Sequence, residues 1–181
     1  MQANATSKPS ECLVSCGGQI VQPTITYCEK TPAGDQGWVS QLTHIISNHV
    51  IPQNHAGFTF DPRLNQCLAL GPNTNPETYV VSIAGHELKS PGTPTELDLS
   101  RWILERLELL CREGNYIGGW PHHGGLCLDI SVLIRGKAAA MTFGWANRQE
   151  AIYHPASGRS LKVSMPIDAD GSSKRRSTME K

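Results

Sequence analysis

The chain has 181 residues, 39% of them hydrophobic, and its 16 basic and 16 acidic residues give a formal net charge of zero. This length predicts one domain, because domains typically run to about 100–200 residues. Zero net charge argues against general binding to nucleic acid or acidic membranes, which needs a basic field. No apolar run approaches the roughly 18–20 residues of a membrane span. Residues 1–11 also lack the apolar core of a secretory signal.

Six cysteines are present, and without a secretory signal we expect reduced thiols and a cytoplasmic protein, with disulfides as the alternative. Cys12, Cys16 and Cys28 could begin a zinc site. Its remaining ligand would have to come from afar, for example from His44, His49 or His55. Closed zinc sites usually combine two close pairs of ligands, and the second pair is missing here. We therefore expect no metal and no other cofactor.

Residues 1–35 are rich in Gln, Thr, Ser, Pro and Gly and show no sustained period, which predicts a flexible leader with a short strand near Gln19–Thr26. Residues 36–164 carry the periodic segments and should form a single domain. Residues 165–181 are polar and charged and predict a disordered tail.

The first periodic segment predicts a helix over Gly37–Val50, where apolar residues recur every three or four positions. Asp35 is its expected N-cap and Pro52 its expected stop. Turn residues at positions 61–65 separate two extended runs and predict a hairpin. Tyr79–Ile83 is rich in β-branched and aromatic residues and predicts a strand, with a loop over residues 86–92.

The strongest predicted helix covers Pro94–Arg112, with one apolar face. Thr93 is its expected N-cap, Pro94 its first residue, and Glu96 completes a capping box. Arg106 falls on the apolar side, where its stem could lie along the edge of the core.

Residues 115–131, NYIGGWPHHGGLCLDIS, predict a hairpin whose second strand alternates between apolar and polar residues, as a half-buried strand does. Gly118-Gly119 is expected at a bulge or a close backbone approach, since no helix follows it to make a phosphate loop. A helix over Lys137–Asn147 and a second hairpin, Glu150–His154 with Arg159–Val163, complete the chain. The predicted fold class is α+β, with antiparallel hairpins packed by two or three helices.

Several segments together resemble a family of proteins. They are GFTFDP and YVVSIAGHE within Gly57–Glu87, then NYIGGW, LDIS, an Ala-rich helix, RQEAIYH and Ser157-Gly158. This order resembles a group of small uncharacterised proteins common in actinobacteria and their phages. The resemblance spans most of Gly57–Val163 and implies a fold and a phage or mobile-element setting, but no reaction. The chain departs from the group at His154, where an Asp is usual, and at His122-His123, which replaces an acidic turn.

The catalytic candidates are His122, His123, Asp129 and His154. Adjacent histidines in a tight turn cannot easily share one metal, so exposed turn residues are the simpler interpretation. His154 and Asp129 could converge on one face if the two hairpins pair. Cys127 could act as a nucleophile with a histidine and Asp129, although buried thiols are usually inert.

The sequence therefore favours a non-enzymatic interaction protein, encoded by a phage or mobile element, that binds a host protein, for example as an inhibitor of host defence. Its expected contact residues are Trp120, His122, His123 and Tyr153, although Trp120 also suits a core position. The alternative is a small hydrolase or transferase that uses the His/Asp residues around the 120–130 hairpin. Nucleic-acid binding would need five basic residues, at positions 101, 106, 112, 135 and 137, to form one patch. The sequence leaves the oligomeric state open.

Overall fold

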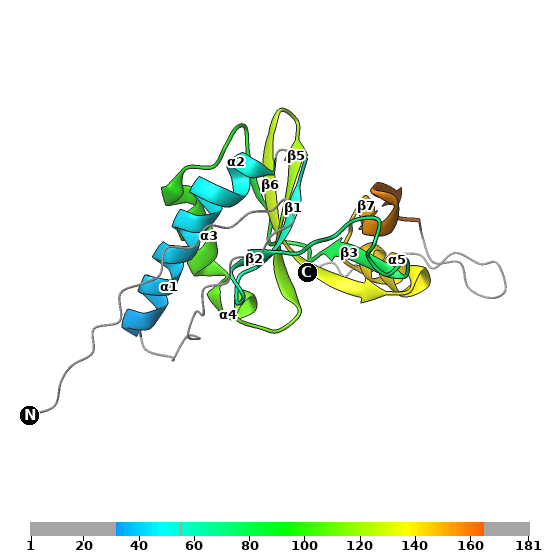
Figure 1. Ribbon diagram of the computed structural model, residues 1–181, viewed down its shortest axis with the longest axis horizontal. Helices are drawn as coiled ribbons and strands as arrows, with labels where there is room; N and C mark the ends of the chain where they lie inside the picture. The colour runs from blue at the N-terminus through cyan, green and yellow to red at the C-terminus, as the bar shows by residue number, and fades with distance from the viewer. Residues whose placement is uncertain (1–31, 55, 165–181) are drawn as a thin grey trace, which may run out of the picture.

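The computed structural model describes residues 32–54 and 56–164, and these form an α+β fold around one antiparallel sheet (Figure 1). The strand order is β2-β1-β5-β6-β3-β7-β8, and β4 also pairs with β6. The strands are β1 (Phe58–Asp61), β2 (Gln66–Cys67), β3 (Thr78–Ser82), β4 (Leu88–Ser90), β5 (Asn115–His122), β6 (Gly125–Arg135), β7 (Ala151–His154) and β8 (Arg159–Lys162). The helices are α1 (Pro32–Ile45), α2 (Ile51–Gln53), α3 (Glu96–Glu105), α4 (Leu107–Leu110) and α5 (Lys137–Ala146). The predicted fold class is confirmed, whereas the expected strand near Gln19–Thr26 and the tail lie outside the described residues.

Strand β6 organises the sheet because both of its edges are paired. One edge pairs with β5 over residues 125–132. The other edge pairs with β4 at residues 126–128 and with β3 at residues 131–135. The segment that forms β4 was predicted as a loop. Leu88–Ser90 is too short and too polar to signal a strand, and its pairing with distant β6 is what makes it one.

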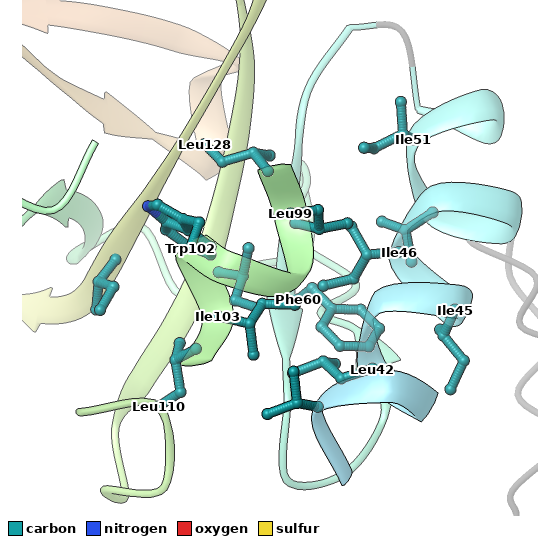
Figure 2. Packing of buried hydrophobic residues seen from close by; sticks show 14 residues of the cluster. Leu42, Ile45, Ile46, Ile51, Phe60, Leu99, Trp102, Ile103, Leu110 and Leu128 are labelled. Carbon is teal, nitrogen blue, oxygen red and sulfur yellow. The ribbon is translucent and has the colours of Figure 1, made fainter. Parts of the chain in front are cut away.

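The main core lies between the helices α1, α3 and α4 and one face of β1, β5 and β6 (Figure 2). Phe60, Ile117 and Leu128 come from three adjacent strands and are fully buried. The helices contribute Leu42, Ile46, Leu99, Ile103 and Leu110, all at most 2% exposed. Each such side chain stabilises the fold by about 1.5–3 kcal/mol relative to an exposed one.

A second core forms where α5 packs on β3 and β7. Val132 and Ile134 of β6 pack against it, and they continue the same alternation as Leu128 and Ile130 of the main core. The twist of a β-strand rotates successive side chains, so the two ends of β6 can face different helices. Figure 1 shows α1 and α3 on one side of the β5–β6 ladder and α5 on the other.

The first helical segment is longer than predicted, because it begins at Pro32 rather than after an Asp35 cap. It also continues past the expected stop at Pro52 to Gln53. A π-helical turn over Ile46–Val50 precedes this proline, and the Ile51 N–H bonds to the carbonyl of Ile46. Proline inside a helix removes one backbone hydrogen bond and clashes with the preceding turn. A wider turn is a common way for a helix to accommodate such a residue.

The second predicted helix is divided, and its N-cap is Thr95 rather than Thr93. The Thr95 hydroxyl accepts a hydrogen bond from the Asp98 N–H at 3.1 Å. Arg106 has a non-helical backbone and separates α3 from α4. Its guanidinium lies 5.3 Å from the centre of the Trp102 ring, which places the stem at the edge of the core as predicted.

Candidate binding site

The β5–β6 hairpin ends in a two-residue turn formed by His123 and Gly124. Both residues have positive φ, 46° and 80°. Two consecutive positive φ values match the twist of the flanking strands, and glycine adopts them at little cost. A Cβ added at Gly125 would lie 1.9 Å from the Ser90 carbonyl oxygen, so the β4 backbone supports the turn at close range. The β4 backbone therefore packs directly against the base of the turn.

Below the tip, Asp129 of β6 is only 1% exposed. Its Oδ2 accepts hydrogen bonds from the Trp120 indole Nε1 at 2.8 Å and from the Ser82 hydroxyl at 2.7 Å. Its Oδ1 accepts one from the Ser131 hydroxyl at 2.6 Å. Donors of this kind stabilise a buried carboxylate, since an unpaired buried charge is costly.

This network needs a glycine opposite it. Gly118 pairs with Asp129 across the β5–β6 ladder. A Cβ at Gly118 would lie 2.4 Å from Asp129 Oδ1 and 2.6 Å from the Ser131 hydroxyl. At Gly119 the obstacle is the Phe58 ring, 2.3 Å away. The predicted close approach at Gly118-Gly119 is confirmed.

The network also corrects the expected burial of β6. Asp129 and Ser131 lie on the side of the alternation that a half-buried strand leaves exposed, yet both are at most 2% exposed, as is Cys127, for which a buried thiol was the simpler expectation. The middle of β6 is therefore buried on both faces. Polar residues occupy one face because they bond to one another and to Trp120.

Trp120 is 39% exposed even though its indole N–H is fixed on the buried carboxylate. The His122 ring meets it edge-on at 5.0 Å, and the His123 ring meets His122 at 4.2 Å. Three aromatic rings thus run from the Asp129 network to the hairpin tip. We call Trp120, His122, His123 and the neighbouring Lys89 the tip surface.

The surroundings of His122 lower its pKa. Partial desolvation lowers the pKa of His122, and the nearby His123 and Lys89 lower it further, while Glu150 acts in the opposite direction. His122 is thus more readily neutral than an isolated histidine.

The candidate nucleophile Cys127 is fully buried, and burial with the nearby Asp129 carboxylate raises its pKa to about 11. Its thiol donates to the Leu128 carbonyl at 3.7 Å. A thiol in such surroundings stays protonated at neutral pH and is a poor nucleophile. The Cys-His-Asp arrangement therefore lacks a thiolate. It also lacks a histidine bonded to Asp129, because the side chains that donate to Asp129 in the described part of the chain are Trp120, Ser82 and Ser131.

His154 is not brought to Asp129. Its ring stacks on Tyr79 at 4.8 Å, and Tyr79 lies on the face of β3 opposite to Ser82 and the Asp129 network. Its Nε2 donates to the Pro76 carbonyl at 2.8 Å, and its Nδ1 lies 2.7 Å from the Ser157 hydroxyl. These contacts hold the β7–β8 turn against β3, so His154 has a structural position.

Tyr153, the remaining predicted contact residue, is 38% exposed. It pairs with Val80, and Val80 pairs with Leu133 near the far end of β6. Trp120 pairs instead with Cys127, six residues earlier along β6. Since a strand rises about 3.3 Å per residue, Tyr153 and Trp120 lie in different parts of the sheet.

The cysteine and metal predictions fall partly outside the described residues, which exclude Cys12, Cys16, Cys28 and His55. Cys67 is disulfide-bonded, so the expectation of reduced thiols is wrong for this residue. That expectation had supported a cytoplasmic location, which stays a prediction. Within residues 32–54 and 56–164, no group of three or more His, Cys, Asp or Glu side chains could hold a metal ion. No helix of these residues is long and apolar enough to cross a membrane.

Sequence reasoning missed the link between Trp120 and Asp129 and the role of Ser82. The alternation in β6 did place Asp129 on the polar face, and Gly118 directly opposite was a signal that something bulky lies there. Ser82 carried no such signal, because it is 47 residues away from Asp129 along the chain.

No protein-family model, curated protein or solved structure matches this chain.

Proposed function

We propose that this chain is a small non-enzymatic interaction protein that binds and modulates a protein of its host, in a phage or mobile-element setting. The observation that carries the proposal is Trp120, which is 39% exposed while its indole N–H is fixed by Asp129 at 2.8 Å. Tryptophans are enriched among the residues that dominate protein–protein affinity. A side chain already held in place loses little conformational entropy on binding.

The chemistry of the polar residues supports binding over catalysis. Asp129, Cys127 and His154 are each engaged in contacts that hold the fold together. The two remaining candidate histidines, His122 and His123, lie at a turn beside an exposed aromatic ring. Such a combination of an amphipathic ring and rotatable polar groups is typical of contact surfaces.

The test is a photo-crosslinking experiment in host-cell lysate with a crosslinking residue at position 123. A matched probe at Leu97 reports on a different exposed surface, since Leu97 lies on α3 and is 68% exposed. We expect one host protein to be captured from position 123 and not from position 97. Capture of the same proteins from both positions, or of none, would refute the proposal.

The purified partner then allows Trp120→Ala to be compared with Trp120→Phe. Phenylalanine keeps a ring but cannot donate to Asp129, whereas alanine removes both. Since contact residues of this type are worth about 2 kcal/mol or more, we expect Trp120→Ala to weaken binding about 30-fold and Trp120→Phe much less. Equal affinities for wild type and Trp120→Ala would exclude Trp120 as the anchor.

A further inference from the structure

The ionisable side chains of the tip surface are all basic. Residues 119–128 and 88–92, which form the hairpin tip and the β4 segment beside it, contain no aspartate or glutamate. They contain His122, His123 and Lys89. Lys89 pairs with Cys127, which in turn pairs with Trp120, so the lysine and the indole lie on the same face, one strand apart.

Within residues 32–54 and 56–164, the carboxylates that act on His122 or on the neighbouring Cys127 are Asp129, Glu87 and Glu150, and two of them are already engaged. Asp129 is buried under Trp120 and bonded to three donors. Glu87 accepts a hydrogen bond from the Gly85 N–H at 3.1 Å. Glu150, just before β7, is the remaining carboxylate that acts on His122, and its effect is the smallest of the four.

On its β5 side the tip also extends past the neighbouring strand, whereas residues 90–92 support its β6 side. Strand β1 pairs with β5 only as far as Gly119. Trp120 and the turn continue beyond that point, and Figure 1 shows the β5–β6 loop at the upper edge of the molecule. A projecting edge of this kind fits a concave surface better than a flat one.

We propose that the tip surface inserts into an acidic cleft of the partner protein, with Trp120 as the apolar anchor and Lys89, His122 and His123 facing carboxylates. This inference rests on the proposed function and adds the chemistry of the partner. Complementary charges across an interface mainly provide specificity and fast association.

The proposal has a pH dependence with a definite sign. In the free protein partial desolvation lowers the pKa of His122, and the nearby His123 and Lys89 lower it further. Carboxylates of a partner would favour that charge, so the complex takes up protons as it forms. Affinity should therefore rise as the pH falls through the titration of His122, by about tenfold for a rise of one unit in its pKa on binding.

The experiment is an NMR titration of the full-length ¹⁵N-labelled protein with a decaglutamate peptide at pH 5.5 and pH 7.5. The Trp120 indole signal, assigned from its loss in Trp120→Phe, reports on the tip. Decalysine and a 12-base-pair DNA duplex serve as comparison probes. Melting temperatures at both pH values confirm that the fold is retained.

We expect decaglutamate to shift the Trp120 indole and the backbone signals of residues 120–125, with affinity at least fivefold higher at pH 5.5. Lys89→Gln and the double variant His122→Gln/His123→Gln should each weaken binding at least threefold, and the double variant should lose the pH dependence. Lys162→Gln, on the exposed β8 strand, is the matched control and should bind as wild type does.

Shifts elsewhere, no shift at millimolar peptide, or a loss in Lys162→Gln equal to that in Lys89→Gln would overturn the inference. DNA binding at the tip as tight as that of decaglutamate would also overturn it, in favour of a nucleic-acid contact. These outcomes are separate from a failure of the proposed function. A partner captured at position 123 whose contact surface has no acidic cluster would refute only the inference, whereas capture of no host protein, or of the same proteins from positions 123 and 97, would refute the proposed function.

Discussion

Replacing Asp129 by alanine tests the physical account of the tip, because this side chain receives three hydrogen bonds of 2.6–2.8 Å. The two serine hydroxyls can rotate toward other acceptors, but the indole N–H of Trp120 is fixed by its ring. A buried donor left without an acceptor costs about 1–3 kcal/mol. The space left by the carboxylate adds about 1 kcal/mol. We therefore expect Asp129→Ala to lower the free energy of unfolding by about 2–4 kcal/mol.

Asp129→Asn provides the matched comparison, since it keeps the volume of the side chain. Its amide oxygen can accept from both Trp120 and Ser82, and its amide nitrogen can donate to the Ser131 hydroxyl. All three side chains then keep a hydrogen bond to residue 129, although the Ser131 O–H must rotate to another acceptor, and the charge is lost. Because a hydrogen bond to a charged group is worth about 1 kcal/mol more than a neutral one, we expect a loss near 1–2 kcal/mol, smaller than that of Asp129→Ala.

Urea unfolding followed by circular dichroism measures both values, provided that the slope against denaturant is unchanged. The Trp120 indole signal should move in both variants and broaden in Asp129→Ala, where the ring is no longer held. Equal losses for the two variants, or a loss below 1 kcal/mol for Asp129→Ala, would refute the reasoning that the carboxylate holds Trp120 in place.

Three further predictions concern other positions. Gly118→Ala places a methyl group 2.4 Å from Asp129 Oδ1, so it should lower the free energy of unfolding in urea by about 1–3 kcal/mol. The control Gly37→Ala, on α1, meets nothing within 4 Å and should raise it by up to about 1 kcal/mol. An unchanged stability of Gly118→Ala would contradict the packing described. Thr95→Ala removes the cap of α3 and should cost about 1 kcal/mol, measured the same way, while Thr95→Asp should retain most of the stability. The Cys127 thiol, with its pKa raised to about 11, should resist alkylation at pH 8 in the folded protein and react once urea unfolds it; rapid labelling of the native protein would show that the site opens.

The sequence by itself determined the local structure around the tip. The alternation of β6 identifies its apolar face, because side chains of a strand point to opposite sides in turn. Gly124 after His123 identifies the turn, since few residues adopt positive φ. The apolar spacing within residues 37–50 and 94–112 identified helices, although their ends were misplaced. Helix ends depend on single capping contacts, such as that of Thr95, rather than on a repeated pattern.

Only the tertiary structure decided which residues meet. The sequence contains no signal that pairs β3 and β4 with the same edge of β6, because strand pairing between distant segments is chosen by the fold as a whole. That pairing brings Ser82 to Asp129 and places His154 on the opposite face of the sheet. Periodic patterns record which side of an element is buried, but not against what. The exposed tryptophan on a buried carboxylate therefore became visible only when the strands were assembled.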